Sequence, residues 1–428
     1  MNVRRRDTHV LSGPGLVLVV AVGLLLLIGV VMVYSASSVS DYVHYSDSAY
    51  HAKKQALYIL AGILALGAIS HWDFRLRKTR TASGLGALLK PEFVSWGVWW
   101  MSVAGLLGVI LVGVGKWGAT RSLDLGPVFI QPSEFAKLGC LLVTALLVTR
   151  WKRGELDTRT FARRLGFAVV VVVVLVMLQP DFGTTVSILA AVVVALWLGG
   201  VQGRWFAGIF GIGIPAGALV IKLANYRAER IASFLDPWAD ASDSGYQIIQ
   251  SLYAFGSGGL FGVGLGLSRQ KYFYLPAAHN DFIFAIIGEE GGLIASMTVV
   301  ALFALFAWAG MRIAVRCQDP FGRVVAGGLT AMIVIQALMN MAAVTWLMPI
   351  TGIPLPFVSA GGSSMILTLA SVGVILAVHR RTGRPSVRLV RRADSRGSQS
   401  ADSRERRRNG GTHLPGADGG SPTRRRGA

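Results

Sequence analysis

Ten long apolar runs constrain the fold of this chain more than any other feature of its sequence. A helix needs about 20 mainly apolar residues to cross a bilayer, because lipid offers the backbone no hydrogen-bond partners. Only 15% of the 428 residues are charged, whereas soluble domains carry about 25%. We therefore expect an all-α integral membrane protein with ten transmembrane helices. The apolar runs cover residues 14–34, 55–72, 94–115, 134–149, 165–179, 182–200, 206–222, 281–310, 324–346 and 358–379.

The basic residues predict how these spans are oriented. Five basic residues fall in 71–93, six in 150–164 and fourteen in 380–428, and all three segments lie on one side of a ten-helix chain. Because basic loops favour the cytoplasmic side, we expect both termini there. The arginines before the first span do not indicate a cleaved signal peptide, since the run is long and nine more follow.

The spans divide the chain into three parts. We expect residues 1–13 to form a cytoplasmic N-terminus and residues 14–379 a membrane domain with a large outer loop at about 223–280. Residues 380–428 have too few large apolar side chains for a core, which predicts a disordered cytoplasmic tail. The net charge of +20 would also fit nucleic-acid binding. Attraction of the basic tail to anionic membrane lipids is the favoured interpretation, and no nucleic-acid partner is expected.

The expected outer loop mixes charged, aromatic and glycine residues. Asp236, Pro237 and Trp238 form a turn signal, and the amphipathic stretch 246–255 predicts a short interfacial helix. The six glycines between residues 256 and 266 permit either a flexible re-entrant loop or close backbone approach around a substrate.

The residues before the eighth span are the first candidates for chemistry. His279, Asn280 and Asp281 directly precede an apolar run, and Asn280 is expected to cap the helix, which leaves Asp281 available. Glu289 lies roughly 12 Å deeper along the helix axis. A carboxylate at that depth is costly, so we expect it to face a polar cavity or a basic partner.

The fourth span begins with a second polar group. Gln131 and Ser133 precede Glu134 and Lys137, and the order of Pro, Ser and Glu is typical of a helix start. Glu134 and Lys137 are three residues apart, so they form either an ordinary ion pair on one helix face or part of a functional site. Arg121 supplies another cation on the outer side.

Two further junctions carry polar groups at membrane depth. Asp181 joins two spans with almost no loop, and the favoured interpretation is that it caps the second helix. Three prolines in 348–364 exclude a regular helix there. Such backbone must be buried in protein or line a cavity, and it leads into Ser363.

Six sequence blocks in a fixed order resemble the SEDS family of bacterial shape, elongation and division proteins, which includes FtsW and RodA. The blocks are YSASS, QPSEFAKL, QPDFGTT, SFLDPWAD through GVGLG, SRQKYFYLP through GEEGG, and TGIPLPFVSAGGSS. The residues that depart from the family's pattern are Ser122, Ala277, Asn280 and Ala360.

The resemblance implies a peptidoglycan glycosyltransferase that polymerises lipid II into β-1,4 glycan strands at the outer face of the bacterial cytoplasmic membrane. It implies a class B penicillin-binding transpeptidase and other division proteins as partners, with enrichment at the septum. The family's essential acidic residue falls on Asp281 and its neighbouring cation on Lys137. A divalent cation, Mg²⁺ or Mn²⁺, held by Asp281 is left open as a cofactor.

The expected site therefore has one catalytic carboxylate, Asp281, and a set of substrate contacts. These contacts are Lys137, Arg121, Glu134, Ser133, Gln131, His279, Asn280, Lys271, Glu289 and Ser363. A lipid II flippase or transporter, an elongation polymerase of the RodA type and a non-catalytic division scaffold remain as alternatives. A flippase would need a charged path that continues inward, whereas the candidate residues gather on the outer side.

Overall fold

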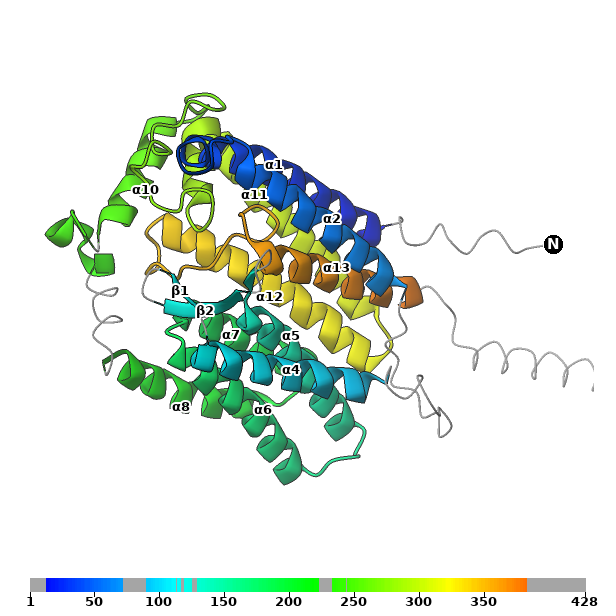
Figure 1. The fold of residues 1–428 in the computed structure, drawn as a ribbon. Coiled ribbons are helices and arrows are strands. Elements are labelled where there is room, and N and C mark those ends of the chain that lie inside the picture. Colours follow the sequence, from blue (N-terminus) through cyan, green and yellow to red (C-terminus); the bar gives the residue numbers. More distant parts are fainter. Residues whose placement is uncertain are drawn as a thin grey trace, which may run out of the picture. The chain divides into compact units, whose positions relative to one another are not determined.

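Helices dominate the part of the chain that the structure describes. The computed structural model describes residues 13–71, 90–112, 114–116, 119–124, 129–222, 233–243 and 245–382. The helices (Figure 1) are α1 (Pro14–Tyr45), α2 (Tyr50–Ser70), α4 (Pro91–Val112), α5 (Pro132–Lys152), α6 (Thr158–Leu178), α7 (Phe182–Leu198), α8 (Gly203–Lys222), the 3₁₀ helix η1 (Pro237–Asp240), α10 (Tyr246–Gly258), α11 (Ile283–Arg316), α12 (Pro320–Val344) and α13 (Gly362–Thr382).

Eight of the described helices are long and apolar enough to cross a membrane. They are α1, α2, α4, α5, α6, α11, α12 and α13. The other two expected spans correspond to α7, which is apolar but has 17 residues, and α8, which has 20 residues. The chain is thus a multi-pass helical membrane protein. The expected short helix at 246–255 is also present, as α10.

A small antiparallel sheet departs from the expected all-α fold. Strands β1 (Val114–Lys116), β2 (Ala119–Asp124) and β3 (Phe129–Ile130) pair in the order β1-β2-β3 between α4 and α5. The apolar run that continues to residue 115 suggested a longer third span. Glycine is a poor helix former, and Gly115 follows soon after the end of α4.

Two helix ends differ from the expected spans for physical reasons. α1 continues past the apolar run to Tyr45, and Ser37 there donates to the buried carboxylate of Asp41, with 2.7 Å between Oγ and Oδ2. α13 begins at Gly362 rather than at residue 358, because the proline-containing segment 351–361 is not helical. As expected for such backbone, most of this segment is buried.

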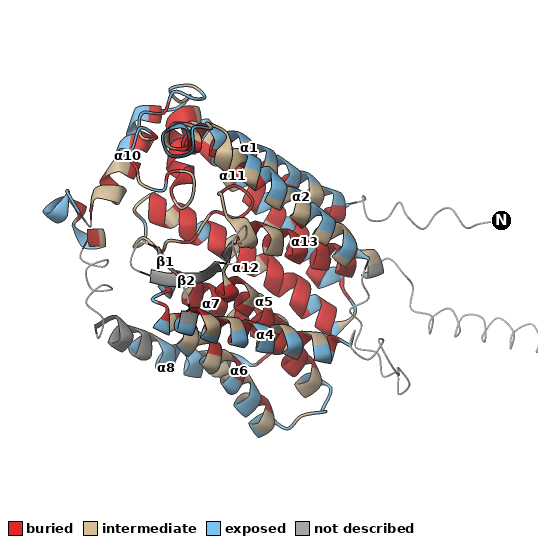
Figure 2. Ribbon diagram, in the orientation of Figure 1, coloured by how far each residue is buried: buried red, intermediate tan, exposed pale blue. Residues whose placement is uncertain are grey.

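Burial indicates which helices face lipid. α5, α12 and α13 are mostly buried, whereas few residues of α2 and α6 are buried (Figure 2). Leu57, Leu60 and Leu64 on α2 are among the exposed large apolar side chains. Lipid tails are as apolar as leucine, so such a surface is stable in a bilayer. In the interior, α2 packs against α13, α4 against α5, and α1 against α11.

The helix α11 is broken at Gly292, where φ is 67° and ψ is −163°. At the break, neighbouring backbone N–H and C=O groups lose their hydrogen bonds within the helix. Backbone groups of the glycine-rich loop 259–264 form hydrogen bonds with them instead. Val263 N donates to Glu289 O at 2.9 Å, and Leu293 N donates to Gly259 O at 2.9 Å. The loop is therefore fixed against α11 by backbone hydrogen bonds.

We expect Gly262→Ala to lower the thermal stability more than Gly266→Ala. Their φ angles are 81° and 78°, so both variants share the backbone strain of a positive φ. A Cβ on Gly262 would lie 2.1 Å from the carbonyl oxygen of Glu290, whereas one on Gly266 would meet no atom within 4 Å. Thermal unfolding midpoints of the detergent-solubilised variants measure the difference. Equal midpoints would contradict the close approach of this loop to α11.

Candidate active site

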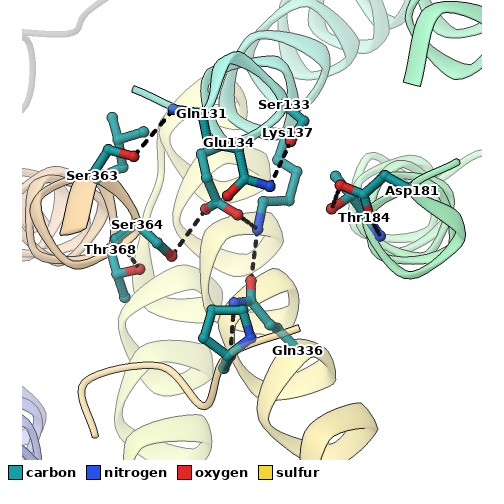
Figure 3. Close-up of polar contacts among 12 residues, drawn as sticks. Gln131, Ser133, Glu134, Lys137, Asp181, Thr184, Gln336, Ser363, Ser364 and Thr368 are labelled. Carbon is teal, nitrogen blue, oxygen red and sulfur yellow. Dashed lines mark hydrogen bonds and ion pairs between the residues drawn. The ribbon is translucent and has the colours of Figure 1, made fainter. Parts of the chain in front are cut away.

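A buried ion pair lies in the first two turns of α5. Lys137 Nζ is 2.8 Å from Glu134 Oε1, and the two side chains are only 2% and 6% exposed. Lys137 Nζ also donates to Gln336 Oε1 on α12 at 2.7 Å (Figure 3). Buried charges are tolerated when they are paired and hydrogen-bonded, as both are here. The ion pair that the sequence left open for Glu134 and Lys137 is thus present, and its functional role stays a prediction.

The start of α13 joins this ion pair (Figure 3). Ser364 Oγ donates to Glu134 Oε2 at 3.1 Å, and Gln131 N donates to Ser363 Oγ at 3.3 Å. Gln131 Nε2 also donates to Ser133 Oγ at 3.1 Å. The structure thus brings together five of the residues predicted from the sequence, from two segments far apart in the chain.

Asp281 lies half-buried just before α11. The N-cap of α11 is Phe282, and it makes no side-chain capping hydrogen bond. The predicted cap by Asn280 is therefore wrong, because the helix begins at Ile283, too far along the chain for Asn280 to serve as its N-cap. By contrast, Asp181 caps α7 as expected and accepts a hydrogen bond from the backbone N of Thr184 at 3.1 Å.

The chain around Asp281 is held through its main-chain oxygens. Asn340 Nδ2 donates to Asp281 O at 2.7 Å, and Ser359 Oγ donates to Asn280 O at 2.7 Å. These donors come from α12 and from the proline-containing segment 351–361. The position of Asp281 is thus fixed by bonds that do not use its carboxylate.

Two amides on α12 connect the ion pair with the Asp281 segment. Gln336 and Asn340 are four residues apart, so they lie on one face of the helix about one turn from each other. Gln336 binds the Lys137 ammonium and Asn340 binds the main chain of Asp281. The structure therefore brings Lys137 and the Asp281 segment to the same face of α12.

The same amides hold the proline-containing segment. Gln336 Nε2 donates to Pro354 O at 3.2 Å, and Asn340 Nδ2 donates to Ile353 O at 2.8 Å. The sequence analysis missed both amides. They could have been found as two amides one helical turn apart inside the apolar run 324–346. Buried polar groups in such a run need hydrogen-bond partners.

Glu289 and Lys271 lie in a second polar cluster. Glu289 accepts hydrogen bonds from the hydroxyl of Ser268 and from backbone N–H groups of the same loop. Lys271 Nζ lies 3.6 Å from Glu290 Oε1, which also accepts from Ser35 Oγ of α1 at 2.6 Å. The partner of Glu289 is thus a set of loop donors rather than a cation. The contacts of this cluster tie the loop to α11 and α1.

Several expected features lie outside the described residues. The backbone of Arg121 belongs to β2, but its side chain is among those not described. Residues 1–12, 223–232 of the outer loop and 383–428 lie wholly outside the described part of the chain. The contacts of Arg121 and the structure of the tail therefore stay predictions.

Comparison with known proteins identifies the family. A family model described as "Cell cycle protein", which covers FtsW, RodA and SpoVE, matches residues 16–384. The chain belongs to the FtsW/RodA/SpoVE family. The stage V sporulation protein E of Bacillus subtilis is 39% identical over 374 residues, which cover 86% of this chain and 98% of the relative. A probable peptidoglycan glycosyltransferase FtsW of Geobacter sp. (strain M18) is 38% identical and covers 86% and 96%.

Solved structures of this family have the same fold. A chain from a peptidoglycan synthase complex, described as coordinating polymerization and crosslinking, matches with a TM-score of 0.66 and 26% identity, covering 86% of this chain and 98% of its own length. The rod shape determining protein RodA of Thermus thermophilus matches with a TM-score of 0.60 and 25% identity, covering 90% and 100%. The resemblance drawn from the six sequence blocks is confirmed.

A metal site was left open for this family member. Among the residues that the structure describes, no three His, Cys, Asp or Glu side chains are grouped so that they could hold a metal ion. Asp281 is thus not part of a ready-made ligand cluster in this part of the chain.

His279 lies in a cluster with His51 and Asp41. The ring centroids of His279 and His51 are 4.5 Å apart, and the Nδ1 of His51 is hydrogen-bonded to the fully buried carboxylate of Asp41. Burial lowers the pKa of His279 to about 4, repulsion from His51 adds to this, and Asp41 opposes it. His279 is therefore neutral at neutral pH.

We expect His279 to reduce the stability of the protein as the pH falls below 6.5. The unfolded chain binds the proton near pH 6.5 and the folded chain only near pH 4, so the unfolded state holds more protons between these values. The full effect is about 3 kcal/mol. Between pH 7.5 and 4.5, the thermal unfolding midpoint of His279→Gln should fall less than that of the wild type. His44 is exposed, so His44→Gln is the control variant. If the unfolding midpoint of His279→Gln changed with pH as that of the wild type does, the lowered pKa of His279 would be refuted.

Proposed function

We propose that this member of the FtsW/RodA/SpoVE family is a peptidoglycan glycosyltransferase that polymerises lipid II into β-1,4 glycan strands. One observation carries the proposal: the Glu134–Lys137 ion pair and the Asp281 segment meet on one face of α12, through Gln336 and Asn340. A carboxylate and a cation at one site are what transfer of a sugar from a diphosphate requires. The names of several relatives support the same activity.

The proposed reaction is a single inverting displacement. Lipid II presents an α-linked sugar on a diphosphate, and the new bond is β-1,4, so one attack by the acceptor 4-hydroxyl is sufficient. Asp281 removes the proton of that hydroxyl as the general base. The diphosphate leaves without a general acid, and its developing negative charge is offset by Lys137 and Arg121.

The distribution of buried charge favours a polymerase over a flippase. Among the described residues, seven charged side chains are buried: Asp41, Glu134, Lys137, Asp181, Lys271, Glu289 and Glu290. Five of them lie at or near the end of the bundle where α5, α7 and α11 begin and α1 ends, and Glu289 and Glu290 lie about two turns inside α11. A flippase needs polar or charged groups along its whole path, since a charge in the bilayer interior is costly. We propose that this end is the outer face, with ten spans and both termini cytoplasmic.

We further propose that the chain works with a class B penicillin-binding transpeptidase and other division proteins, in septal wall synthesis. The similarity to a chain of a peptidoglycan synthase complex supports a crosslinking partner. The fourteen basic residues of 380–428 would bind anionic lipid at the cytoplasmic surface. An elongation role of the RodA type is the competing assignment. Depletion of the chain distinguishes them, because loss of septal synthesis gives filaments and loss of elongation gives rounded cells.

A reconstitution tests the proposed activity. We expect the purified chain, together with its transpeptidase partner in liposomes, to convert fluorescent lipid II into strands that a β-1,4-specific muramidase digests. Liposomes without the chain are the control. Labelled lipid II that moves between leaflets without forming strands would instead indicate a transporter, and neither movement nor strands would favour a scaffold.

A further inference from the structure

A cavity next to the proposed catalytic residues has no role in the reaction so far. It lies between the first turns of α2 and the start of α13 and has a volume of about 180 Å³. The described residues that line it are His51, Lys54, Gln55, Tyr58, Ala360, Gly361 and Gly362. This volume equals the share of about six water molecules in the liquid. It accommodates a phosphate group with part of a sugar but not a whole disaccharide peptide.

The wall of the cavity is continuous with the proposed active site. Ala360 N donates to His279 O at 3.1 Å, two residues before Asp281. On its other side, the wall continues into Ser363 and Ser364, which bind Gln131 and the Glu134 carboxylate. A ligand in the cavity would therefore contact the same short segment that joins both halves of the site.

The electrostatics of the cavity favour an anion. Lys54 contributes a half-buried cation, and none of the described lining residues is acidic. The first backbone N–H groups of α13 have no intrahelical acceptor, and this end of the 21-residue helix carries partial positive charge. Gly361 and Gly362 carry no side chains that would keep an anion away from these N–H groups.

Gln55 indicates that the ligand is more than a simple anion. Its side chain is 3% exposed, and its Nε2 donates to Val358 O at 3.2 Å. Its Oε1 is buried and has no hydrogen-bond partner in the described part of the chain. A carbonyl oxygen only accepts, so it needs an N–H or O–H donor. A fully ionised phosphate supplies no donor, whereas a sugar hydroxyl or acetamido N–H does.

We infer that this cavity is a subsite for a sugar phosphate, with the phosphate on Lys54 and the start of α13 and the sugar donating to Gln55 Oε1. That the ligand is part of lipid II rests on the proposed function. Polymerisation brings two lipid-linked molecules together, each with its own diphosphate. The cavity provides a second place where a diphosphate is held.

The test compares neighbouring lysines on α2. Lys53 is exposed and paired with Asp47 at 2.8 Å, so Lys53→Met controls for Lys54→Met. The probe is N-acetylglucosamine 1-phosphate, titrated calorimetrically into the purified full chain, with inorganic phosphate as the second ligand. Lys54→Met should weaken binding of both ligands at least about tenfold relative to Lys53→Met. Gln55→Leu should weaken the sugar phosphate alone.

Kinetics with lipid II separate this inference from the proposed function. Lys54→Met should raise KM at least about tenfold and leave kcat nearly unchanged, since it removes binding rather than chemistry. If Lys54→Met and Lys53→Met bound both ligands equally well and had equal KM values, the proposed subsite would be refuted. This comparison does not depend on whether Gln55→Leu folds. Equal weakening of both ligands by Gln55→Leu would also overturn it. A wild-type chain that binds the probe through Lys54 but forms no strands would instead refute the proposed function.

Discussion

Replacing Asp281 with asparagine is expected to lower the rate of glycan polymerisation by at least about 100-fold, because asparagine keeps the size of the side chain but cannot accept a proton. The substitution should not disturb the fold, since Asn340 and Ser359 hold this segment through main-chain oxygens. The measurement is the initial rate of strand formation from fluorescent lipid II in the reconstituted system.

Asp243 provides a matched control for Asp281→Asn. It is a carboxylate in the described part of the same outer loop, and it is exposed. We expect Asp243→Asn to polymerise at the wild-type rate. The thermal unfolding midpoint of Asp281→Asn should also stay close to that of the wild type. If Asp281→Asn forms strands as fast as Asp243→Asn, Asp281 is not the general base.

The helices could be predicted from the sequence because the bilayer imposes a length and a composition on each span. Each of the ten apolar runs has a helix in the structure. The errors fall where polar residues or proline decide the boundary. α1 runs on to Tyr45 because the buried Asp41 finds partners there, and α13 starts late because Ser359 and Ala360 donate to the main chain of residues 279–280. The length of an apolar run does not predict such local contacts at the ends of a helix.

The site was predictable where it is local in the chain and not where it depends on packing. Glu134 and Lys137 are three residues apart on one helix, so their pairing follows from helix geometry. Ser364 reaches Glu134 from 230 residues away. Gln336 and Asn340 become meaningful only once α12 is packed against α5 and the proline-containing segment. Helical periodicity in a lipid-facing protein does not specify these neighbours.

Lys137→Met should abolish polymerisation and also lower the stability of the protein. It removes the ammonium from a pair that is almost completely buried, which leaves the Glu134 carboxylate without its counter-charge. Breaking a buried ion pair in this way costs about 3–5 kcal/mol. Activity and the thermal unfolding midpoint should fall together in this variant. The single substitution therefore does not distinguish a catalytic Lys137 from a structural one.

The double variant Glu134→Gln with Lys137→Met makes that distinction. It has no unpaired charge, and a glutamine at position 134 can still accept from Ser364. We expect the thermal unfolding midpoint to recover most of the loss seen for Lys137→Met, because replacing both members of a buried pair is often nearly neutral. We expect the polymerisation rate not to recover, because no ammonium is left to offset the charge of the departing diphosphate. A double variant that regains both stability and strand formation would make Lys137 a structural partner of Glu134. The diphosphate would then have to be held by other cations, such as Arg121 and Lys54.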